Sequence, residues 1–389
     1  MILKISLKPL DKFFFGGENG FQEAGQDKNN RRTTYVLTSR NYPQQTAALG
    51  LLRNQLLLQN ELLWDNTAKI TDRGKAKALI GRHGFRKDFT DSYGVIRKVG
   101  PVFLETAKGA LWSPAPLDDV LMPDNKSMTL TRDDHQVWLK GYTEKAGCHA
   151  SLQSDKKTLK TESAFLNRKQ VGITKFVKPS GKPVPEEESE NSYYFQTFKT
   201  FNADHADKKN HPDRFCFYAE VDTTDTASLK SAIVEFGGER STFSMQVSET
   251  ELSEIPLPDI EYLHTQRPSD LRSLVCLSPA LVDTKAVSAL AALMVSSVLP
   301  FRFLQSRIND KEGAAGTEYH QAVYRGEDKK QAKGALLESR LFQLLDRGSV
   351  VHFDPGATTA TGQTIEESLK ELFNQPDLTN IGYNQFTII

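Results

Sequence analysis

The sequence predicts an α+β protein made of two ferredoxin-like domains with inserted β-hairpins and loops. The chain has 389 residues, more than one hydrophobic core usually organises. Each half shows short apolar runs in the order strand, helix, strand, strand, helix, strand, which is the split βαβ pattern. Polar segments interrupt these runs. We therefore expect an N-terminal domain at 1–201 and a C-terminal domain at 202–389.

The first domain is expected to open with a strand at residues 2–8, where apolar and polar residues alternate. Next comes Phe13-Phe14-Phe15-Gly16-Gly17, whose two glycines permit a close backbone approach. Phe beside Gly would suit a base-stacking platform next to a backbone cradle. The commoner alternative is three buried phenylalanines and a turn.

A helix is predicted from about residue 43 to residue 60, with Pro43 in its first turn. Its core face carries Leu49, Leu52 and Leu56. A second stripe carries Pro43, Thr46, Gly50 and Arg53. Gly in a helix costs about 1 kcal/mol relative to Ala, so something should approach the backbone closely here. A phosphate would suit this stripe; tight packing of another element at Gly50, with Arg53 in solvent, is the alternative.

Two segments of the first domain are rich in Lys and Arg. Residues 72–87 include Arg82 and Arg86, and residues 165–178 include Arg168, Lys169 and Lys175. The second segment begins a predicted long hairpin at 165–201, whose Pro-, Glu- and Ser-rich tip at 179–192 is expected to be disordered. Basic segments of this kind suit RNA or a partner protein, although each could be an ordinary solvated surface.

The second domain follows a polar stretch at 202–213. Strands are predicted at 215–221, 243–247, 274–277, 341–345 and 350–353, and helices at 286–298 and 365–373. A second double-glycine turn, Gly237-Gly238, precedes Glu239-Arg240. Near the end, Gly382-Tyr383 forms another turn before a final strand.

Composition and motif searches narrow the possible functions. Lys plus Arg equals Asp plus Glu, at 49 each, so any RNA binding must use local patches. Three widely separated cysteines favour a reducing, cytoplasmic location over disulfides or zinc. The longest apolar run, at 289–299, is too short to span a bilayer. Without a Walker loop, GxSxG, HExxH or GxGxxG, we expect no metal, no cofactor and no catalytic residues.

The order of these motifs resembles the family of the third subunit of the Cmr complex, the type III-B CRISPR effector, within the RAMP superfamily. The resemblance rests on the Phe/Gly turn at 13–17, the Pro-initiated helix with Thr46 and Leu49-Gly50, Gly237–Arg240, Arg347–Val350 and Ile381–Tyr383. In two places the chain departs from the family pattern. The closing turn has one glycine where RAMP proteins usually have a Gly-rich loop, and the loop at 309–334 matches nothing in it.

The resemblance implies two RRM-like domains in a non-catalytic antiviral subunit. Such a subunit would hold the 5′ tag of the CRISPR RNA, meet target RNA only indirectly, and bridge the large palm-domain subunit to the backbone subunits. The alternatives are a RAMP-type, metal-independent endoribonuclease that processes CRISPR repeat RNA, and a protein-only scaffold. Patterns and resemblance together give these candidate RNA-binding residues: Phe13, Phe14, Gly16, Gly17, Gln44, Gln45, Thr46, Gly50, Arg53, Arg82, Arg86, Arg168, Lys169, Lys175, Gly237, Gly238, Arg240 and Tyr383.

Overall fold

The structure of the chain is a computed structural model. It describes residues 1–16, 19–24, 32–64, 69–81, 84–85, 92–119, 128–133, 136–141, 150–173, 193–202, 210–222, 229–302, 304–305, 337–338 and 341–389. The candidates Gly17, Arg82, Arg86 and Lys175, the hairpin tip at 179–192 and the loop at 309–334 lie outside these ranges.

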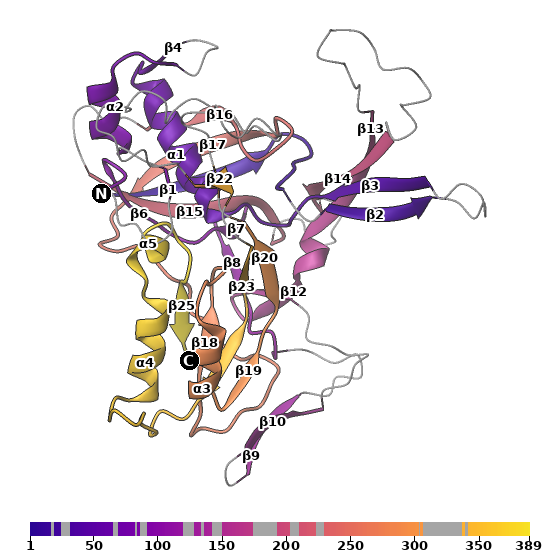
Figure 1. The fold of residues 1–389 in the computed structure, drawn as a ribbon, viewed down its shortest axis with the longest axis vertical. Helices are drawn as coiled ribbons and strands as arrows, with labels where there is room; N and C mark the ends of the chain where they lie inside the picture. Colours follow the sequence, from indigo (N-terminus) through magenta and orange to yellow (C-terminus); the bar gives the residue numbers. More distant parts are fainter. Residues whose placement is uncertain are drawn as a thin grey trace.

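A large sheet forms the first part of the molecule (Figure 1). Its strands are, in spatial order, β12 (Lys157–Lys160), β11 (Ser151–Ser154), β8 (Leu111–Pro114), β7 (Phe103–Thr106), β15 (Pro212–Val221), β1 (Ile2–Pro9), β17 (Thr242–Thr250) and β16 (Ala232–Glu235). β6 (Ile96–Val99) also pairs with β15. The central order β6/β7-β15-β1-β17, antiparallel throughout, is compatible with a ferredoxin-like sheet.

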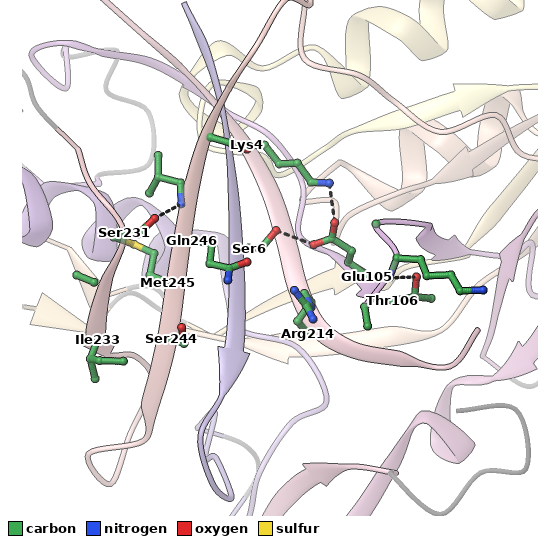
Figure 2. Close-up of a pocket in the computed structure, with 16 residues that line it drawn as sticks. Lys4, Ser6, Glu105, Thr106, Arg214, Ser231, Ile233, Ser244, Met245 and Gln246 are labelled. Carbon is green, nitrogen blue, oxygen red and sulfur yellow. Dashed lines mark hydrogen bonds and ion pairs between the residues drawn. The ribbon is translucent and has the colours of Figure 1, made fainter. Parts of the chain in front are cut away.

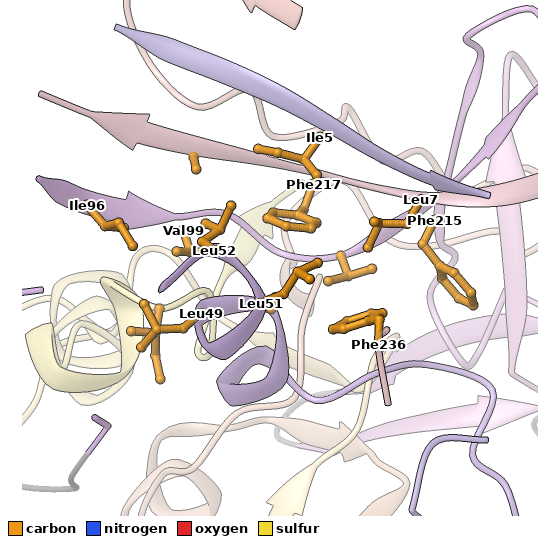
Figure 3. Close-up of a cluster of buried hydrophobic side chains, with 14 of the residues drawn as sticks. Ile5, Leu7, Leu49, Leu51, Leu52, Ile96, Val99, Phe215, Phe217 and Phe236 are labelled. Atoms are coloured by element: carbon orange, nitrogen blue, oxygen red, sulfur yellow. The ribbon is translucent and has the colours of Figure 1, made fainter. Parts of the chain in front are cut away.

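One face of this sheet is covered by α1 (Gln45–Gln59), which packs against α2 (Arg73–Ile80). Leucines of α1 meet apolar side chains of the central strands, as Figure 3 shows for Leu51 near Phe217 and Leu52 near Val99. Helical spacing places Leu49, Leu52 and Leu56 on one side of α1, and strand alternation places Leu3, Ile5 and Leu7 on the facing side of the sheet. The predicted helix at 43–60 is thus confirmed, and its core face is buried.

A second sheet follows the order β19-β24-β18-β25 and is also antiparallel. Its elements along the chain are β18 (Arg272–Cys276), α3 (Thr284–Leu290), β19 (Leu293–Val295), β24 (Val350–Phe353), α4 (Ile365–Phe373), α5 (Pro376–Thr379) and β25 (Phe386–Ile388). β20 (Val298–Phe301) pairs with β23 (Phe342–Leu345). The α+β class is confirmed. The helix expected at 286–298 is only α3, because Leu293–Val295 pairs with β24 instead.

The predicted hairpin projects from the large sheet (Figure 1). β13 (Phe165–Ile173) follows a 3₁₀ turn at Thr161–Ala164 and pairs with β14 (Tyr193–Phe201). β14 also pairs in parallel with β3 (Arg32–Thr38), which pairs with β2 (Asn19–Ala24). Three short pairs complete the described strands: β4–β5 (Leu63–Trp64, Lys69–Ile70), β9–β10 (Thr129–Asp133, Gln136–Lys140) and β21–β22 (Leu304–Gln305, Leu337–Glu338).

The change from one sheet to the other does not fall at the expected boundary, 201/202. β15, β16 and β17 all follow residue 202, and they complete the first sheet around β1. The polar stretch 202–213 resembles a linker in composition, but it leads into a central strand. The change therefore falls between Thr250 and Arg272. Among the described helices, none is long and apolar enough to cross a membrane.

Candidate nucleic-acid interface

The Phe turn at 13–16 and the Gly237-Gly238 turn pack against each other. The Gly238 N–H donates to the Phe14 carbonyl at 2.7 Å. Gly237 has φ +89°, and a Cβ there would lie 2.6 Å from the same carbonyl oxygen. Two segments that the sequence offered as separate RNA contacts thus form one internal contact, and this contact requires the glycine at 237.

The rings of Phe13 and Phe14 belong to the core. Phe13 is fully buried and Phe14 is 8% exposed. The Phe13 ring lies within aromatic contact distance of Phe15, Phe165, Phe201, Phe215 and Phe243. Neither ring offers a free face to a base, so their expected stacking role is wrong. The alternative reading, buried phenylalanines and a turn, fits the structure.

The closing turn of the chain packs against the start of α1. The Gln45 side-chain amide donates to the Gly382 carbonyl at 2.7 Å, and the Tyr383 hydroxyl donates to Gln44 Oε1 at 3.1 Å. Burial raises the pKa of Tyr383, partly offset by hydrogen bonds from Thr46 and from the backbone N–H groups of Thr46 and Gln45. Gln45 and Tyr383 are both fully buried. Tyr383 therefore caps α1, and the helix N-terminus is not free for an anion.

Gly50 and Arg53 differ from both expectations for their stripe. Gly50 is exposed, and no atom of the described structure lies within 4 Å of a Cβ built there. Tight internal packing at Gly50 is therefore wrong. Arg53 donates from Nε to the Ile80 carbonyl at 3.1 Å, at the end of α2. Its guanidinium thus links α1 to the end of α2. Gly50 is the position on the stripe whose backbone is exposed to solvent.

Four other candidates lie on the surface. Arg168 and Lys169 are exposed on β13, opposite Phe198 and Thr197 of β14. Gly16 and Arg240 are exposed at the two packed turns. Their side chains, or backbone in the case of Gly16, are accessible to a partner molecule.

The structure also shows a cavity that the sequence did not reveal. It has a volume of about 320 Å³ and lies beside the start of α1, between the two sheets. Its lining includes Arg40, Tyr42, Lys199, Asp346 and Arg347. Among the described lining residues, three are cationic and one is acidic, so the cavity favours an anion. Arg347 belonged to a recognised motif, but only the fold brings it to Tyr42.

Arg347 is the cavity's most unusual residue. Its side chain is 8% exposed, and its guanidinium lies 4.5 Å from the centre of the Tyr42 ring. Nε and Nη2 have no hydrogen-bond partner among the described residues, and the Tyr42 hydroxyl also has none there. Burial lowers the pKa of Arg347, but a guanidinium remains charged at neutral pH. The cavity therefore holds a buried guanidinium with two nitrogens that have no hydrogen-bond partner among the described residues.

A larger hollow, shown in Figure 2, is electrostatically different. It has a volume of about 820 Å³ and lies on the sheet face that β1 turns away from α1. Lys4 Nζ pairs with Glu105 at 2.5 Å, and the Ser6 hydroxyl donates to the same carboxylate at 2.6 Å. Arg214 pairs with Asp213 at 2.8 Å. Lys4 and Arg214 therefore already have acidic partners, and the third lining cation, Lys108, is exposed to solvent, so the cavity with the buried Arg347 is the better anion site.

No metal centre is evident in the part of the chain that the structure describes. Within it, no group of three or more His, Cys, Asp or Glu side chains could hold a metal ion.

Comparison with known proteins identifies a relative of the first part of the chain. Residues 5–171 match the family described as CRISPR-associated protein (Cas_Cmr3). The cryo-EM structure of "the Type III-B Cmr-beta bound to cognate target RNA" has a chain 14% identical, with TM-score 0.46, covering 100% of this chain and 96% of its own. The same complex with target RNA and AMPPnP gives 13% identity, TM-score 0.44, and coverage of 99% and 96%. No curated protein matches the sequence significantly.

Proposed function

We propose that the chain is a subunit of a type III-B effector complex that holds the 5′ tag of the CRISPR RNA, because residues 5–171 match the family described as CRISPR-associated protein (Cas_Cmr3). We further propose that it bridges the large palm-domain subunit to the backbone subunits, meets target RNA only indirectly, and catalyses no reaction itself.

The family match carries this proposal. It includes all of α1 and its open point at Gly50, and it reaches β13 with its exposed Arg168 and Lys169. Since the Phe13 and Phe14 rings are buried, readout would rest on phosphates and shape. We propose that the tag passes over α1 at Gly50, and that the hairpin cations meet a neighbouring subunit or the guide–target duplex.

Bulk at Gly50 tests the tag-holding role. In a complex reconstituted from its subunits and CRISPR RNA, Gly50→Trp should expose the 5′ tag to nuclease, whereas Gly50→Ala should leave it protected. Ser288→Trp, on an exposed position of α3, controls for surface bulk. If the Gly50→Trp complex assembles and protects the tag as the unchanged complex does, α1 does not hold the tag.

The absence of catalysis is tested with labelled CRISPR repeat RNA and the purified chain in EDTA. One hydrogen-bonded series of side chains resembles a catalytic Ser-His-Asp triad. Ser273 Oγ is 2.9 Å from His352 Nδ1, and His352 Nε2 is 2.9 Å from Asp118 Oδ2. All three side chains are fully buried, so this group joins the second sheet to the segment after β8 and cannot meet a substrate. Cleavage at a single site, lost on one His substitution, would instead establish an endoribonuclease.

A further inference from the structure

We propose that the cavity between the two sheets binds a phosphate group, and that Arg347 and Tyr42 are its principal ligands. The guide RNA as a source of that phosphate rests on the proposed function; the phosphate site itself does not.

The first argument is the state of Arg347. Burying a charged group without a counter-charge or hydrogen bonds is costly. Two of its guanidinium nitrogens and the nearby Tyr42 hydroxyl nevertheless lack partners among the described residues. Asp346 does not compensate in full, because its Oδ1 accepts the backbone N–H of Arg347 at 2.8 Å. A ligand that brings negative charge and several acceptor oxygens would satisfy all these donors together.

The second argument is that Arg347 is held in place before any ligand arrives. The next residue, Gly348, has φ +79°, and a Cβ there would lie 2.6 Å from the Ala115 carbonyl oxygen. The Gly348 carbonyl accepts the Leu117 N–H at 2.9 Å. This fixes the turn between β23 and β24 against the first sheet. The Tyr42 ring then supports the guanidinium, so little conformational entropy remains to be lost on binding.

The third argument concerns the chemistry of the ligand. A guanidinium presents a planar fork that matches two oxygens of a phosphate. Arg40 and Lys199 add positive charge to the lining. Burial lowers the pKa of Lys199 because it disfavours the charged amine, and a bound anion would counteract this effect. A volume of about 320 Å³ accommodates a phosphate with its attached sugar. The N-terminus of α1 contributes nothing, since Tyr383 caps it.

The test uses the full chain and three probes: inorganic phosphate, adenosine 5′-monophosphate and a short RNA carrying the tag. Binding is measured by calorimetry and by the rise in melting temperature. Arg347→Met should weaken phosphate binding at least tenfold, Arg347→Lys less, and Tyr42→Phe a few-fold. Arg272→Gln, which removes an exposed charge paired with Glu366, should stay within twofold of the unchanged protein. Without ligand, Arg347→Met should melt no lower than the unchanged protein, because it removes an uncompensated buried charge.

The outcomes separate the two proposals. If Arg347→Met loses phosphate and nucleotide binding but the reconstituted complex still protects its tag, the ligand is a free phosphate compound. If the tag also becomes accessible, the ligand is an RNA phosphate. Three results would each overturn the phosphate site. The first is that Arg347→Met binds every probe as the unchanged protein does, and the second is that the unchanged protein binds none of them. The third is that a poly-glutamate peptide competes for the site more strongly than inorganic phosphate does. Tag protection in Gly50→Trp judges the proposed function independently.

Discussion

Gly50 occupies the middle of α1, and no atom of the described residues lies within 4 Å of the place where its side chain would begin. Its φ is not positive, so Ala fits the same backbone, and the glycine reduces helix stability without a compensating internal contact. We expect Gly50→Ala to raise the free energy of unfolding by about 0.5–1 kcal/mol. Urea unfolding of the isolated chain measures this. A loss of stability would show that an internal contact does require the glycine.

Two tyrosines near the cavity differ in what their hydroxyls do. The Tyr383 hydroxyl caps α1 and donates to Gln44, whereas the Tyr42 hydroxyl has no partner among the described residues. Tyr383→Phe should therefore cost about 1–2 kcal/mol of folding free energy, and Tyr42→Phe should cost almost nothing in the absence of ligand. Parallel urea titrations compare them; equal losses would contradict the capping role of Tyr383.

At the scale of elements, the sequence signals were strongest where one period dominates. The spacing of leucines predicted α1 to within two residues at each end, and the aromatic and basic strands of the hairpin were placed correctly. The apolar stretch 286–298 was ambiguous, because a short apolar run suits a helix or a buried strand equally. Pairing of Leu293–Val295 with β24 decided it, and pairing depends on residues far away in the chain.

The hairpin yields an element-scale prediction. Arg168 and Lys169 are exposed on β13, so replacing both with Gln should change stability by less than about 0.5 kcal/mol. If they contact phosphates, RNA binding should weaken, and the slope of log affinity against log salt should fall by about 2. Filter binding at several salt concentrations measures the slope. The matched control is the pair Lys156→Gln and Lys157→Gln, whose side chains are exposed at the turn from β11 to β12. If both double variants change the affinity and its salt slope equally, the hairpin does not contact the RNA.

For the whole molecule, most of the recognised motifs turn out to contact one another. The Phe turn packs on Gly238, the closing turn packs on α1, and Gly348 packs on the segment after β8. A single sequence cannot show this, because the partners are hundreds of residues apart, such as Gln45 and Gly382. It follows that the closing turn and Gly348 join the second sheet to the first, whereas the Phe turn and Gly238 hold the first sheet to itself.

Substitution of Gly382 tests how tightly the closing turn packs against the first sheet and α1. Its φ is +88°, and a Cβ there would lie 2.6 Å from the Gly100 carbonyl oxygen. Gly362 has a similar φ, +84°, but no atom of the described structure lies within 4 Å of its Cβ position. Gly362→Ala should therefore cost only backbone strain, about 1 kcal/mol.

Gly382→Ala carries the same strain and must also push the closing turn away from β6 and α1, so we expect about 2–4 kcal/mol. Because Tyr383 follows directly and caps α1, the displacement should also loosen the N-terminus of the helix. Urea unfolding with hydrogen exchange across residues 44–50 measures both effects. Equal destabilisation by the two substitutions would mean that the second sheet holds its place without this turn, and that the cavity beside it does not depend on the junction.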